Sequence, residues 1–381
     1  MYTEPIRKHL VLPLEKFANE VFSQKYNPFY YHGALPNVFI WSLFISGLVL
    51  FAYYQPTLAT AYESVSLITY ELPYGNAFRS MHRYAADGMM IFVLLHMFRV
   101  WFTDRFREYR ILPWLTGVII ISLMLIIGLT GYMLIWDQEA KTLTEATFSL
   151  MSRLPLIGDW LVSLLLVDGK LQDNTLTKIM FLHFAIPVLL MFLLFLHYMR
   201  ITRPVTTPPL ALIVLLFGGV VLVSGLAPVG LGQPPAVGMP TTPVNLQLDL
   251  LYAWPQWLLF GAGWSPVWVW VVTLAVPVLL VALPYVQKKG LRSHFAQVTK
   301  DNCTGCSLCY HDCPYEAIEM VDRNDGSRFK RLATVDPGRC ANCGLCVGAC
   351  AFKAIEIPRR ESPDVLEEIQ KTFAAANALS A

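Results

Sequence analysis

The sequence predicts a mostly α-helical, polytopic membrane protein with six transmembrane helices and a small α+β domain near its C-terminal end. Three observations predict this fold class. Of 381 residues, 55% are hydrophobic and 15% are charged, with a mean hydropathy of +0.48. Six long apolar stretches precede residue 287, and all eight cysteines follow residue 302. This composition excludes an ordinary soluble enzyme, and we expect no nucleic-acid partner.

The N-terminal segment is predicted to be a short helix that lies on the membrane surface. Its sequence, MYTEPIRKHLVLPLEKF, is amphipathic and mixed in charge. In a helix, Leu10, Leu14 and Phe17 would share one side that can enter the lipid boundary. A soluble arm is the alternative. The segment lacks the pattern of a signal peptide.

Six stretches are long enough to cross about 30 Å of hydrocarbon at about 1.5 Å per residue. In chain order they cover residues 34–55, 77–101, 112–136, 176–200, 208–228 and 264–286. The fifth is the shortest and ends in the Gly-rich sequence GGVVLVSGLAP, so its end is the least defined. A polar link at 287–302 then leads to the small domain.

The distribution of Lys and Arg predicts the orientation of these spans in an inner, cytoplasmic membrane. On the side of the two chain ends, the positive residues are Arg7, Lys8, Lys16, Lys25, Arg99, Arg105, Arg107, Arg110, Arg200, Arg203, Lys288, Lys289 and Arg292. The opposite side has Lys141, Arg153 and Lys170 in the long segment between the third and fourth spans, and Arg79, Arg83 and Lys178 lie toward that side within the helix ends without reversing the bias. Both termini and the small domain are therefore predicted to be cytoplasmic.

Two histidine pairs occur at the same interval in the second and fourth spans. His82 and His96 are fourteen residues apart, and so are His183 and His197. Fourteen residues turn a helix by about 1400°, within about 40° of four full turns, and advance it by about 21 Å, so each pair shares one helix face. The two spans run in the same direction, which places His82 level with His183 and His96 level with His197.

Each level offers two imidazoles to one iron, so the sequence predicts two six-coordinate b-type haems stacked across the bilayer. A lone histidine in a membrane helix is more often a hydrogen-bonded contact or a proton relay. Two equal intervals in two helices of the same direction favour ligands instead. The remaining histidines, His9, His32, His294 and His311, fall outside this pattern and receive no role.

Four glycines follow the same interval on the first and third spans. Gly33 and Gly47 are fourteen residues apart, as are Gly117 and Gly131. A residue without a Cβ lets a flat macrocycle approach the backbone, whereas glycines in membrane helices otherwise serve helix packing. Their shared interval predicts that the first four spans form a four-helix bundle around two haems.

Haem propionates are anions, and arginines adjoin both predicted haem levels. Arg79 lies one turn before His82, and Arg99 lies about one turn after His96. We predict that Arg79 and Arg99 bind the propionates. The alternative is that these side chains extend to the membrane surface, which applies most to Arg83.

Residues 1–286 resemble cytochrome b of the quinol-oxidising bc complexes, especially the chloroplast and cyanobacterial form that is divided into two subunits. The resemblance is carried by RSMHRY, HMFRVWFTDRFRE, WLTGVIII with GLTGYMLIWDQ, LPLIGDWL and TLTKIMFLHFAIPVLLMFLLFLH. It is close over the first four spans and looser over the last two. The resemblance implies that the four histidines bind two haems, that quinone sites lie near each haem on opposite membrane faces, and that the protein is a homodimer.

Two positions depart from that family. Its quinol-oxidation loop carries Pro-Glu-Trp-Tyr, whereas the aligned stretch here is PQWL at residues 255–258. Gln256 is thus expected to line the outer quinone site, but an amide cannot accept the quinol proton as a carboxylate can. This argues against quinol oxidation there, unless Asp137 or Glu139 takes the proton. No cysteine occurs near the first span, which excludes the covalently attached third haem of the divided form.

Two cysteine motifs in the small domain share one spacing. CTGCSLCYHDCP contains Cys303, Cys306, Cys309 and Cys313, and CANCGLCVGACA contains Cys340, Cys343, Cys346 and Cys350. This run resembles the bacterial two-cluster ferredoxin, in which the fourth cysteine of each motif binds the other cluster. Zinc is the alternative for any set of four cysteines.

The ferredoxin resemblance implies two [4Fe–4S] clusters with crossed ligand sets. The first cysteine set is Cys303, Cys306, Cys309 and Cys350. The second cysteine set is Cys340, Cys343, Cys346 and Cys313. The sequences YEAIEM and FKAIEI, which follow the two motifs, each predict a short helix and then a strand.

These assignments predict a dihaem domain at 1–205, a second cytochrome b-like segment at 206–287, a ferredoxin domain at 288–360 and a tail helix at 361–381. We expect an oxidoreductase subunit that passes electrons between a cytoplasmic redox partner, the two clusters, the two haems and membrane quinone. It would carry out no group-transfer chemistry of its own. The cytoplasmic partner would be a flavoprotein, a nucleotide-oxidising subunit or a reduced ferredoxin, in a complex with further subunits.

Two alternatives are open on the sequence alone. One is a bc-type quinol oxidase subunit that divides quinol electrons between an outer iron–sulfur partner and the ferredoxin domain. The other is an interaction platform whose haems are inert. Inhibitor sensitivity of quinol oxidation would distinguish the first alternative from the expected electron-transfer subunit. Reoxidation of the reduced haem by quinone would exclude the second alternative.

Overall fold

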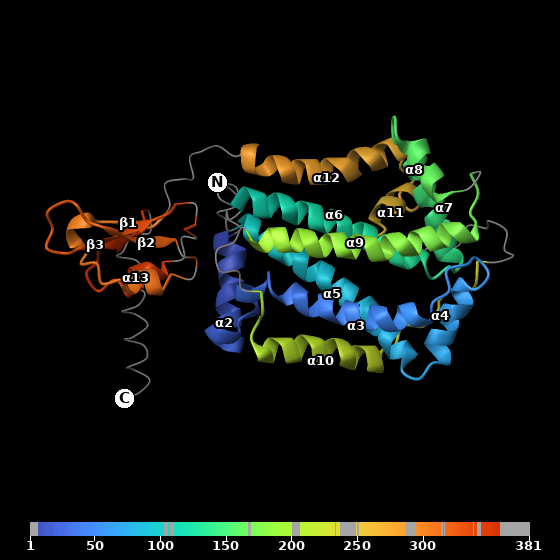
Figure 1. Cartoon of the computed structure of the whole chain (residues 1–381), viewed down its shortest axis with the longest axis horizontal. Coiled ribbons are helices and arrows are strands. Elements are labelled where there is room, and N and C mark those ends of the chain that lie inside the picture. Colours follow the sequence, from blue (N-terminus) through green and yellow to red (C-terminus); the bar gives the residue numbers. More distant parts are fainter. Residues whose placement is uncertain are drawn as a thin grey trace.

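The computed structural model describes residues 7–102, 106, 110–166, 169–199, 206–232, 234–236, 249, 251–286, 295–313, 315, 317–337, 339–340 and 344–358. It contains a bundle of long helices and, beyond one end of the bundle, a small domain of strands and short helices (Figure 1). We call residues 295–358 the cysteine-rich domain. The bundle end that faces this domain is the near end, and the opposite end is the far end. The predicted tail helix at 361–381 lies outside the described residues.

Four long helices form the centre of the bundle, and they pack as two pairs. The first pair is α3 (Leu35–Tyr53) and α5 (Gly75–Phe102), and the second pair is α6 (Ile111–Met133) and α9 (Asp173–Met199). Contacts within each pair are much more extensive than contacts between the pairs. The four predicted bundle helices are therefore present, and the room between them lies between the two pairs.

Two further long helices lie on opposite sides of this centre, as Figure 1 shows. Helix α10 (Leu210–Leu226) packs on α5 and α3, and α12 (Pro266–Val286) packs on α6. The indole Nε1 of Trp114 donates to the carbonyl of Leu280 at 2.7 Å, which joins α6 to α12. By length and composition α3, α5, α6, α9 and α12 can cross a membrane, while α10 is shorter, with 17 residues.

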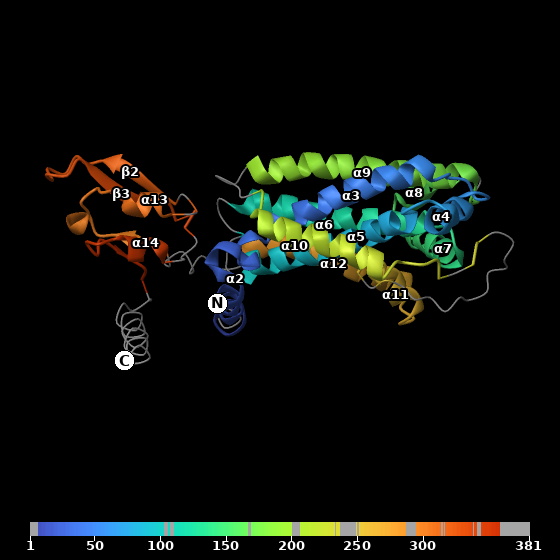
Figure 2. The ribbon, with the colours of Figure 1, turned by 90° about the horizontal axis from the view of Figure 1, so that it is seen from below.

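The predicted surface helix lies across the near end of the bundle (Figure 2). It consists of a π-helical turn, η1 (Arg7–Val11), followed by α2 (Leu12–Tyr26). The predicted apolar side is uncovered, because Leu10, Leu14 and Phe17 are 43–63% exposed. A single 3-10 turn, η2 (Pro28–Tyr31), then leads into α3.

Short helices cover the far end of the bundle. They are α4 (Ala61–Tyr70), α7 (Gln138–Ser152), α8 (Gly158–Leu165) and α11 (Trp254–Phe260). Asp137 directly precedes α7, and its Oδ1 accepts the backbone N–H of Ala140 at 2.8 Å and so caps the helix. The segment after α10 pairs with this start, because the N–H of Gln138 donates to the carbonyl of Pro234 at 3.1 Å.

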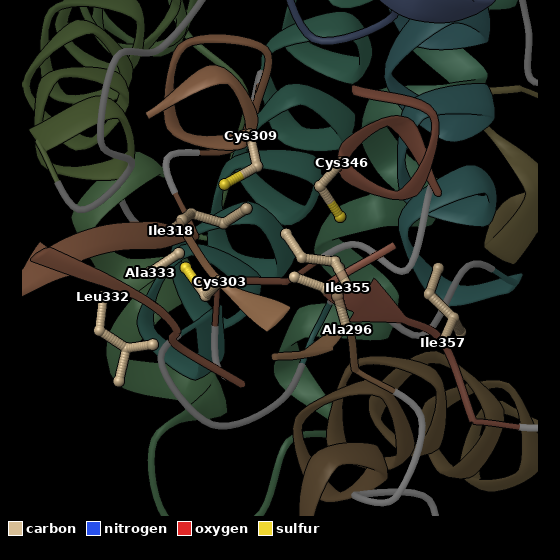
Figure 3. Packing of buried hydrophobic residues seen from close by; sticks show 10 residues of the cluster. Ala296, Cys303, Cys309, Ile318, Leu332, Ala333, Cys346, Ile355 and Ile357 are labelled. Atoms are coloured by element: carbon tan, nitrogen blue, oxygen red, sulfur yellow. The ribbon is translucent and has the colours of Figure 1, made fainter. Parts of the chain in front are cut away.

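The cysteine-rich domain has two small antiparallel sheets. Its elements are β1 (Gln297–Val298), η5 (Lys300–Asn302), α13 (Leu308–His311), β2 (Ile318–Asp322), β3 (Arg331–Val335), α14 (Leu345–Ala349) and β4 (Ile355–Glu356). Strand β1 pairs with β4, and β2 pairs with β3. Three cysteines, Cys303, Cys309 and Cys346, are buried in its core with Ile318 and Ile355 (Figure 3).

Sequence and structure differ at one point in this domain. The strands predicted within YEAIEM and FKAIEI are β2 and β4, but the short helices expected at the start of those stretches are absent from the described residues there. Each helix lies inside the motif instead, because α13 and α14 both end before the fourth cysteine. In each motif three residues separate the third cysteine from the fourth, which is about one turn of helix. The prediction placed this helical turn after the fourth cysteine instead of before it.

Candidate functional site

The far level is formed by His82 on α5 and His183 on α9. Their ring centroids are 6.3 Å apart and their planes differ by 54°. Two metal–imidazole bonds of about 2 Å each would account for about 4 Å of this separation. The distance from each coordinating nitrogen to its ring centre accounts for the remainder. The spacing therefore fits two imidazoles on opposite sides of one metal ion.

The near level is formed by His96 on α5 and His197 on α9. Both side chains line one cavity of about 310 Å³ between the helix pairs. Arg99 lines the same cavity, and its binding of a propionate there stays a prediction. The structure thus brings together the two histidine pairs that the sequence placed at matching depths. Their binding of haem iron stays a prediction.

Each of the four predicted glycines lies against one histidine ring. A Cβ added at the glycine would lie 3.1 Å from Cε1 of the imidazole for Gly33 and His96, 3.3 Å for Gly47 and His82, 3.6 Å for Gly117 and His197, and 3.1 Å for Gly131 and His183. The shared interval of the glycines and histidines has this physical cause. The closest described neighbours of the four glycines are the imidazoles, and the approach of a macrocycle to these glycines stays a prediction.

Hydroxyl groups orient three of the four imidazoles, which the sequence reading missed. Ser46 Oγ lies 3.0 Å from His82 Nδ1, Thr116 Oγ1 lies 3.0 Å from His197 Nδ1, and Thr130 Oγ1 lies 3.1 Å from His183 Nδ1. Each hydroxyl residue directly precedes a predicted glycine. The dipeptides Ser-Gly, Thr-Gly and Thr-Gly were thus a sequence signal that could have revealed these residues.

The contacts of Thr130 show which nitrogen of the histidine is left for a metal. Thr130 Oγ1 lies 3.0 Å and 2.8 Å from the carbonyls of Ile126 and Ile127, so its single proton is directed to its own helix. It must then accept a proton from His183 Nδ1. That nitrogen also lies 3.1 Å from the Ile127 carbonyl, which can only accept. The proton therefore resides on Nδ1, and Nε2 keeps the lone pair that a metal needs.

The fourth glycine differs, because the residue before Gly33 is His32. This imidazole is buried, and its Nδ1 has no hydrogen-bond partner among the residues that the structure describes. Burial and then the charge of Arg99 lower the pKa of His32 to about 4, so the ring is neutral at pH 7. His32 lines the near cavity, although the sequence pattern assigned it no role.

The two arginines predicted to bind propionates have different surroundings. Arg99 lies beside the near level, as described above. Arg79 at the far level donates through Nη1 to the carbonyl of Val229 at 2.5 Å, in the segment after α10. This bond directs that nitrogen of Arg79 to the backbone. The propionate role of Arg79 stays a prediction that depends on the other guanidinium nitrogens.

A partly buried polar network lies beside the far level. Arg83 pairs with Asp87 at 2.6 Å on the same helix and with Asp249 from the segment before α11. The hydroxyl of Tyr132 donates to Asp249 at 2.7 Å. The sequence alone left open that the Arg83 side chain extends to the membrane surface, and the structure places its guanidinium against Asp87 and Asp249. Asp249 was missed because it lies 166 positions further along the chain.

Gln256 is buried in α11 against α7. Its Nε2 donates to Thr147 Oγ1 at 3.0 Å, and its Oε1 has no hydrogen-bond partner within the described ranges. At the start of the same α7, burial raises the pKa of Asp137, and burial together with the charge of Asp137 raises the pKa of Glu139. Both carboxyls are thereby better proton acceptors than an exposed carboxyl would be.

The first cysteine set is brought together in one place. Its four residues line a small common cavity with Gly305 and Phe352. Burial and then the charges of the other three cysteines raise the pKa of Cys309 to about 11. Four thiolates in this position need bound cations to remain ionised, so the donor set fits an iron–sulfur cluster.

The second cysteine set is described in part. Cys346 is buried in the same core as the first set, and Cys313 and Cys340 pack against it, while Cys343 lies outside the described residues. The fourth cysteines of the two motifs have matching surroundings. The N–H of Ala317 donates to Cys313 Sγ at 3.3 Å, and that of Ala354 donates to Cys350 Sγ at 3.2 Å. Such bonds to sulfur tune the potential of a cluster.

Comparisons with known families and proteins agree with both parts of the chain. The family described as Cytochrome b/b6/petB matches residues 17–204, and the 4Fe-4S dicluster domain matches residues 302–354. Cytochrome b6 of Prochlorococcus marinus (strain MIT 9303) is 34% identical over 205 residues, which are 52% of this chain and 94% of that protein. Cytochrome b6 of Synechococcus sp. (strain CC9311) is 34% identical with the same coverage.

A solved structure supports the fold independently. A chain of a hyperthermophilic respiratory Complex III superposes with a TM-score of 0.54 at 23% sequence identity. The superposition covers 75% of this chain and 83% of the other. At this identity the likeness shows the fold alone. The alignment with the Prochlorococcus marinus cytochrome b6 covers 52% of the chain.

Proposed function

Since this chain belongs to the cytochrome b/b6 family and carries a 4Fe-4S dicluster domain, we propose that it passes electrons between a cytoplasmic redox partner and membrane quinone. One observation supports this proposal above all. Two levels of paired, hydrogen-bonded histidines lie in the bundle, and the near level lies at the end that faces the cysteine-rich domain. A multi-pass membrane protein with this arrangement offers redox sites from one membrane face to the other.

We assign one b-type haem to each histidine level and one [4Fe–4S] cluster to each cysteine set. These four groups supply one-electron reduction and oxidation, which no side chain of the chain provides. The protein's own part is to hold and tune them. Ser46, Thr116 and Thr130 fix the ring orientation at three ligands, and Arg99 supplies a positive charge at the near level. The excess of Lys and Arg near the chain ends supports a cytoplasmic position of the near end.

Membrane quinone is the small-molecule partner, and the complex contains further subunits. We propose a flavoprotein, a nucleotide-oxidising subunit or a reduced ferredoxin as the cytoplasmic partner, and a homodimer by family resemblance. Reduction of quinone to quinol consumes two electrons and two protons. The chain supplies the electrons one at a time, and the protons come from the aqueous side next to the quinone.

Reduced-haem spectra of the purified chain test this function. We expect dithionite to produce the absorption bands of reduced haem b. Added quinone should reoxidise the haem and remove these bands on the time scale of a stopped-flow experiment. An interaction platform with inert haems would keep the reduced bands after quinone addition. Absence of protohaem from the purified chain would contradict the proposal altogether.

Quinol oxidation at the far end is a second candidate function, and the surroundings of Asp137 favour keeping it. This carboxyl is buried with a raised pKa at the start of α7, the helix that Gln256 contacts. In this version one quinol electron goes to an outer iron–sulfur partner and one goes inward. We expect Gln256→Glu to increase inhibitor-sensitive quinol oxidation and Asp137→Asn to remove it. If oxidation stays absent in Gln256→Glu with an outer partner present, this candidate is excluded.

A further inference from the structure

We propose that the second cysteine set lies next to the near level and that the first cysteine set faces the soluble partner. The order of redox sites would then be far level, near level, second set, first set, partner. This inference rests on the proposed function, because it orders the sites that such a function requires. It goes beyond that function by assigning different tasks to two cysteine motifs of equal spacing.

The main observation behind this proposal is a junction between the bundle and the cysteine-rich domain. Arg110, which directly precedes α6, donates through Nη2 to the carbonyl of Arg339 at 3.2 Å. Its guanidinium carbon also lies 5.8 Å from the centroid of the Tyr315 ring. Tyr315 is two residues after Cys313, and Arg339 directly precedes Cys340. Both contact points therefore flank cysteines of the second set.

The near cavity leads to the same conclusion. Its walls include His96 and His197 and also Tyr315 and Arg339 of the cysteine-rich domain. Two residues that flank the second set thus share a cavity with both ligands of the near level. Figure 1 shows the domain beyond this end of the bundle.

The first cysteine set has different surroundings. Every residue that lines its cavity belongs to the cysteine-rich domain, among the residues that the structure describes. Cys306 is exposed, and the neighbouring Phe352 is 52% exposed. The first set is therefore open to a partner in solution, on a surface that the bundle leaves uncovered.

A cross-linking experiment tests the junction without any electron transfer. Photo-reactive benzoylphenylalanine in place of Tyr315 is expected to cross-link, on irradiation of the purified full chain, to a peptide that contains Arg110. The same group in place of Phe352 is expected to leave that peptide unmodified. Mass spectrometry identifies the products. A cross-link to that peptide from position 352 instead of 315 would overturn the proposal.

A kinetic experiment tests the order of the two sets. The donor is photochemically reduced methyl viologen, a cation that gives up one electron per molecule, and cluster and haem bands are followed separately. Tyr315→Ala is expected to slow haem reduction by about tenfold or more, because it loosens the junction, while cluster reduction keeps its rate. Phe352→Arg is expected to slow cluster reduction by about three- to fivefold through charge repulsion.

Two matched variants serve as controls for these effects. Ser327→Arg adds the same charge at an exposed position in the turn between β2 and β3, and Tyr310→Ala removes an aromatic ring elsewhere in the domain. Both are expected to keep the haem-reduction rate of the unmodified chain. The order is wrong if Phe352→Arg slows only the haem step, or if Tyr315→Ala leaves that step unchanged. If the unmodified chain shows no haem reduction, the proposed function fails, and the cross-link still decides the junction.

Discussion

The far level and the near level share one ligand arrangement but differ in what surrounds it. At each level α5 and α9 contribute one histidine apiece, and a glycine lies against each ring. The far level has an ion-paired network around Arg83 and Asp249. The near level instead has a cavity that reaches the cysteine-rich domain and is lined in part by the buried His32.

This difference shows which features of a repeated site come from the repeat itself. The interval of fourteen residues produces the histidine and its glycine at both levels, because it returns a helix to almost the same face. Residues outside the repeat produce the network and the cavity. The repeat therefore determines which groups can bind, and the surroundings determine what each level can exchange with.

Replacing a histidine ligand is expected to have the largest effect, and it should affect one level without the other. His96→Leu should remove the near-level haem and retain the far-level haem, because the far pair has its own ligands and hydrogen bonds. His82→Leu should do the reverse. The haem content per chain and a redox titration of each variant measure this. Loss of both haems in either variant would mean that the levels are not independent.

Two glycines on α6, one at each level, allow the two levels to be compared by the same substitution. An added Cβ at Gly131 would lie 3.1 Å from His183 Cε1, whereas one at Gly117 would lie 3.6 Å from His197 Cε1. We expect Gly131→Ala to destabilise the far level by about 1–3 kcal/mol through overpacking. Gly117→Ala makes an ordinary contact and should be nearly neutral. Thermal loss of each haem signal measures both, and equal losses would contradict the prediction.

Loss of the ion-paired network is expected to lower the stability of the far level only. Asp249→Asn removes one partner of Arg83 and the acceptor charge for Tyr132. Because these groups are partly exposed, we expect a loss of about 1–2 kcal/mol of stability rather than the larger value of a fully buried pair. Thermal unfolding followed at the far-level haem measures it. Asp159→Asn, at an exposed carboxylate of the same end, is the control and should change little.

His32 is expected to give the near level a dependence on pH. Its pKa is about 4 in the folded chain, below the ordinary value of 6.5. The unfolded chain therefore binds a proton first as the pH falls, so this contribution to stability is complete above about pH 6.5 and is lost between about pH 6.5 and 4. We expect a loss of roughly 1 kcal/mol between about pH 7.5 and 5.5.

The variant His32→Gln tests that assignment. Its stability should change less over the same pH interval, by roughly the 1 kcal/mol assigned to His32. Denaturation followed at the near-level haem at several pH values provides the comparison. An identical pH slope in both proteins would show that other groups cause the dependence.

Hydroxyl removal is expected to give the smallest and most local effect. Thr130→Val removes one acceptor of the His183 Nδ1 proton but leaves the Ile127 carbonyl in place. The ring then donates less electron density, and we expect the far-level midpoint potential to rise by about 20–60 mV, which corresponds to one hydrogen bond. Thr116→Val should shift only the near level. Thr273→Val, whose hydroxyl bonds within α12, is the control.

The sequence predicted the fold class, the four bundle helices and the residues that form each level. These predictions succeeded because helical periodicity converts spacing directly into direction and depth. The helices within the cysteine motifs were placed too late, since so short an element has no periodicity to read. Cytochrome b-like spans and a dicluster domain are confirmed by the family matches.

The remaining features of the sites depend on contacts between distant parts of the chain. Asp249 reaches Arg83 from 166 positions away, and Arg110 meets Arg339 from 229 positions away. No local pattern records such pairs. The hydroxyl groups at Ser46, Thr116 and Thr130 are a different case, because the residue before each glycine was visible and its meaning appeared only once the imidazoles were placed.

The pairing of helices has a consequence for how the protein is made. Each pair of helices contributes one histidine to each level, together with hydroxyls and glycines that contact the imidazoles. The pair α3–α5 leaves the ribosome before α6 and α9, and it already presents two imidazoles. A haem bound as proposed would therefore meet its first ligands on this hairpin during synthesis, before the second pair of helices has been made.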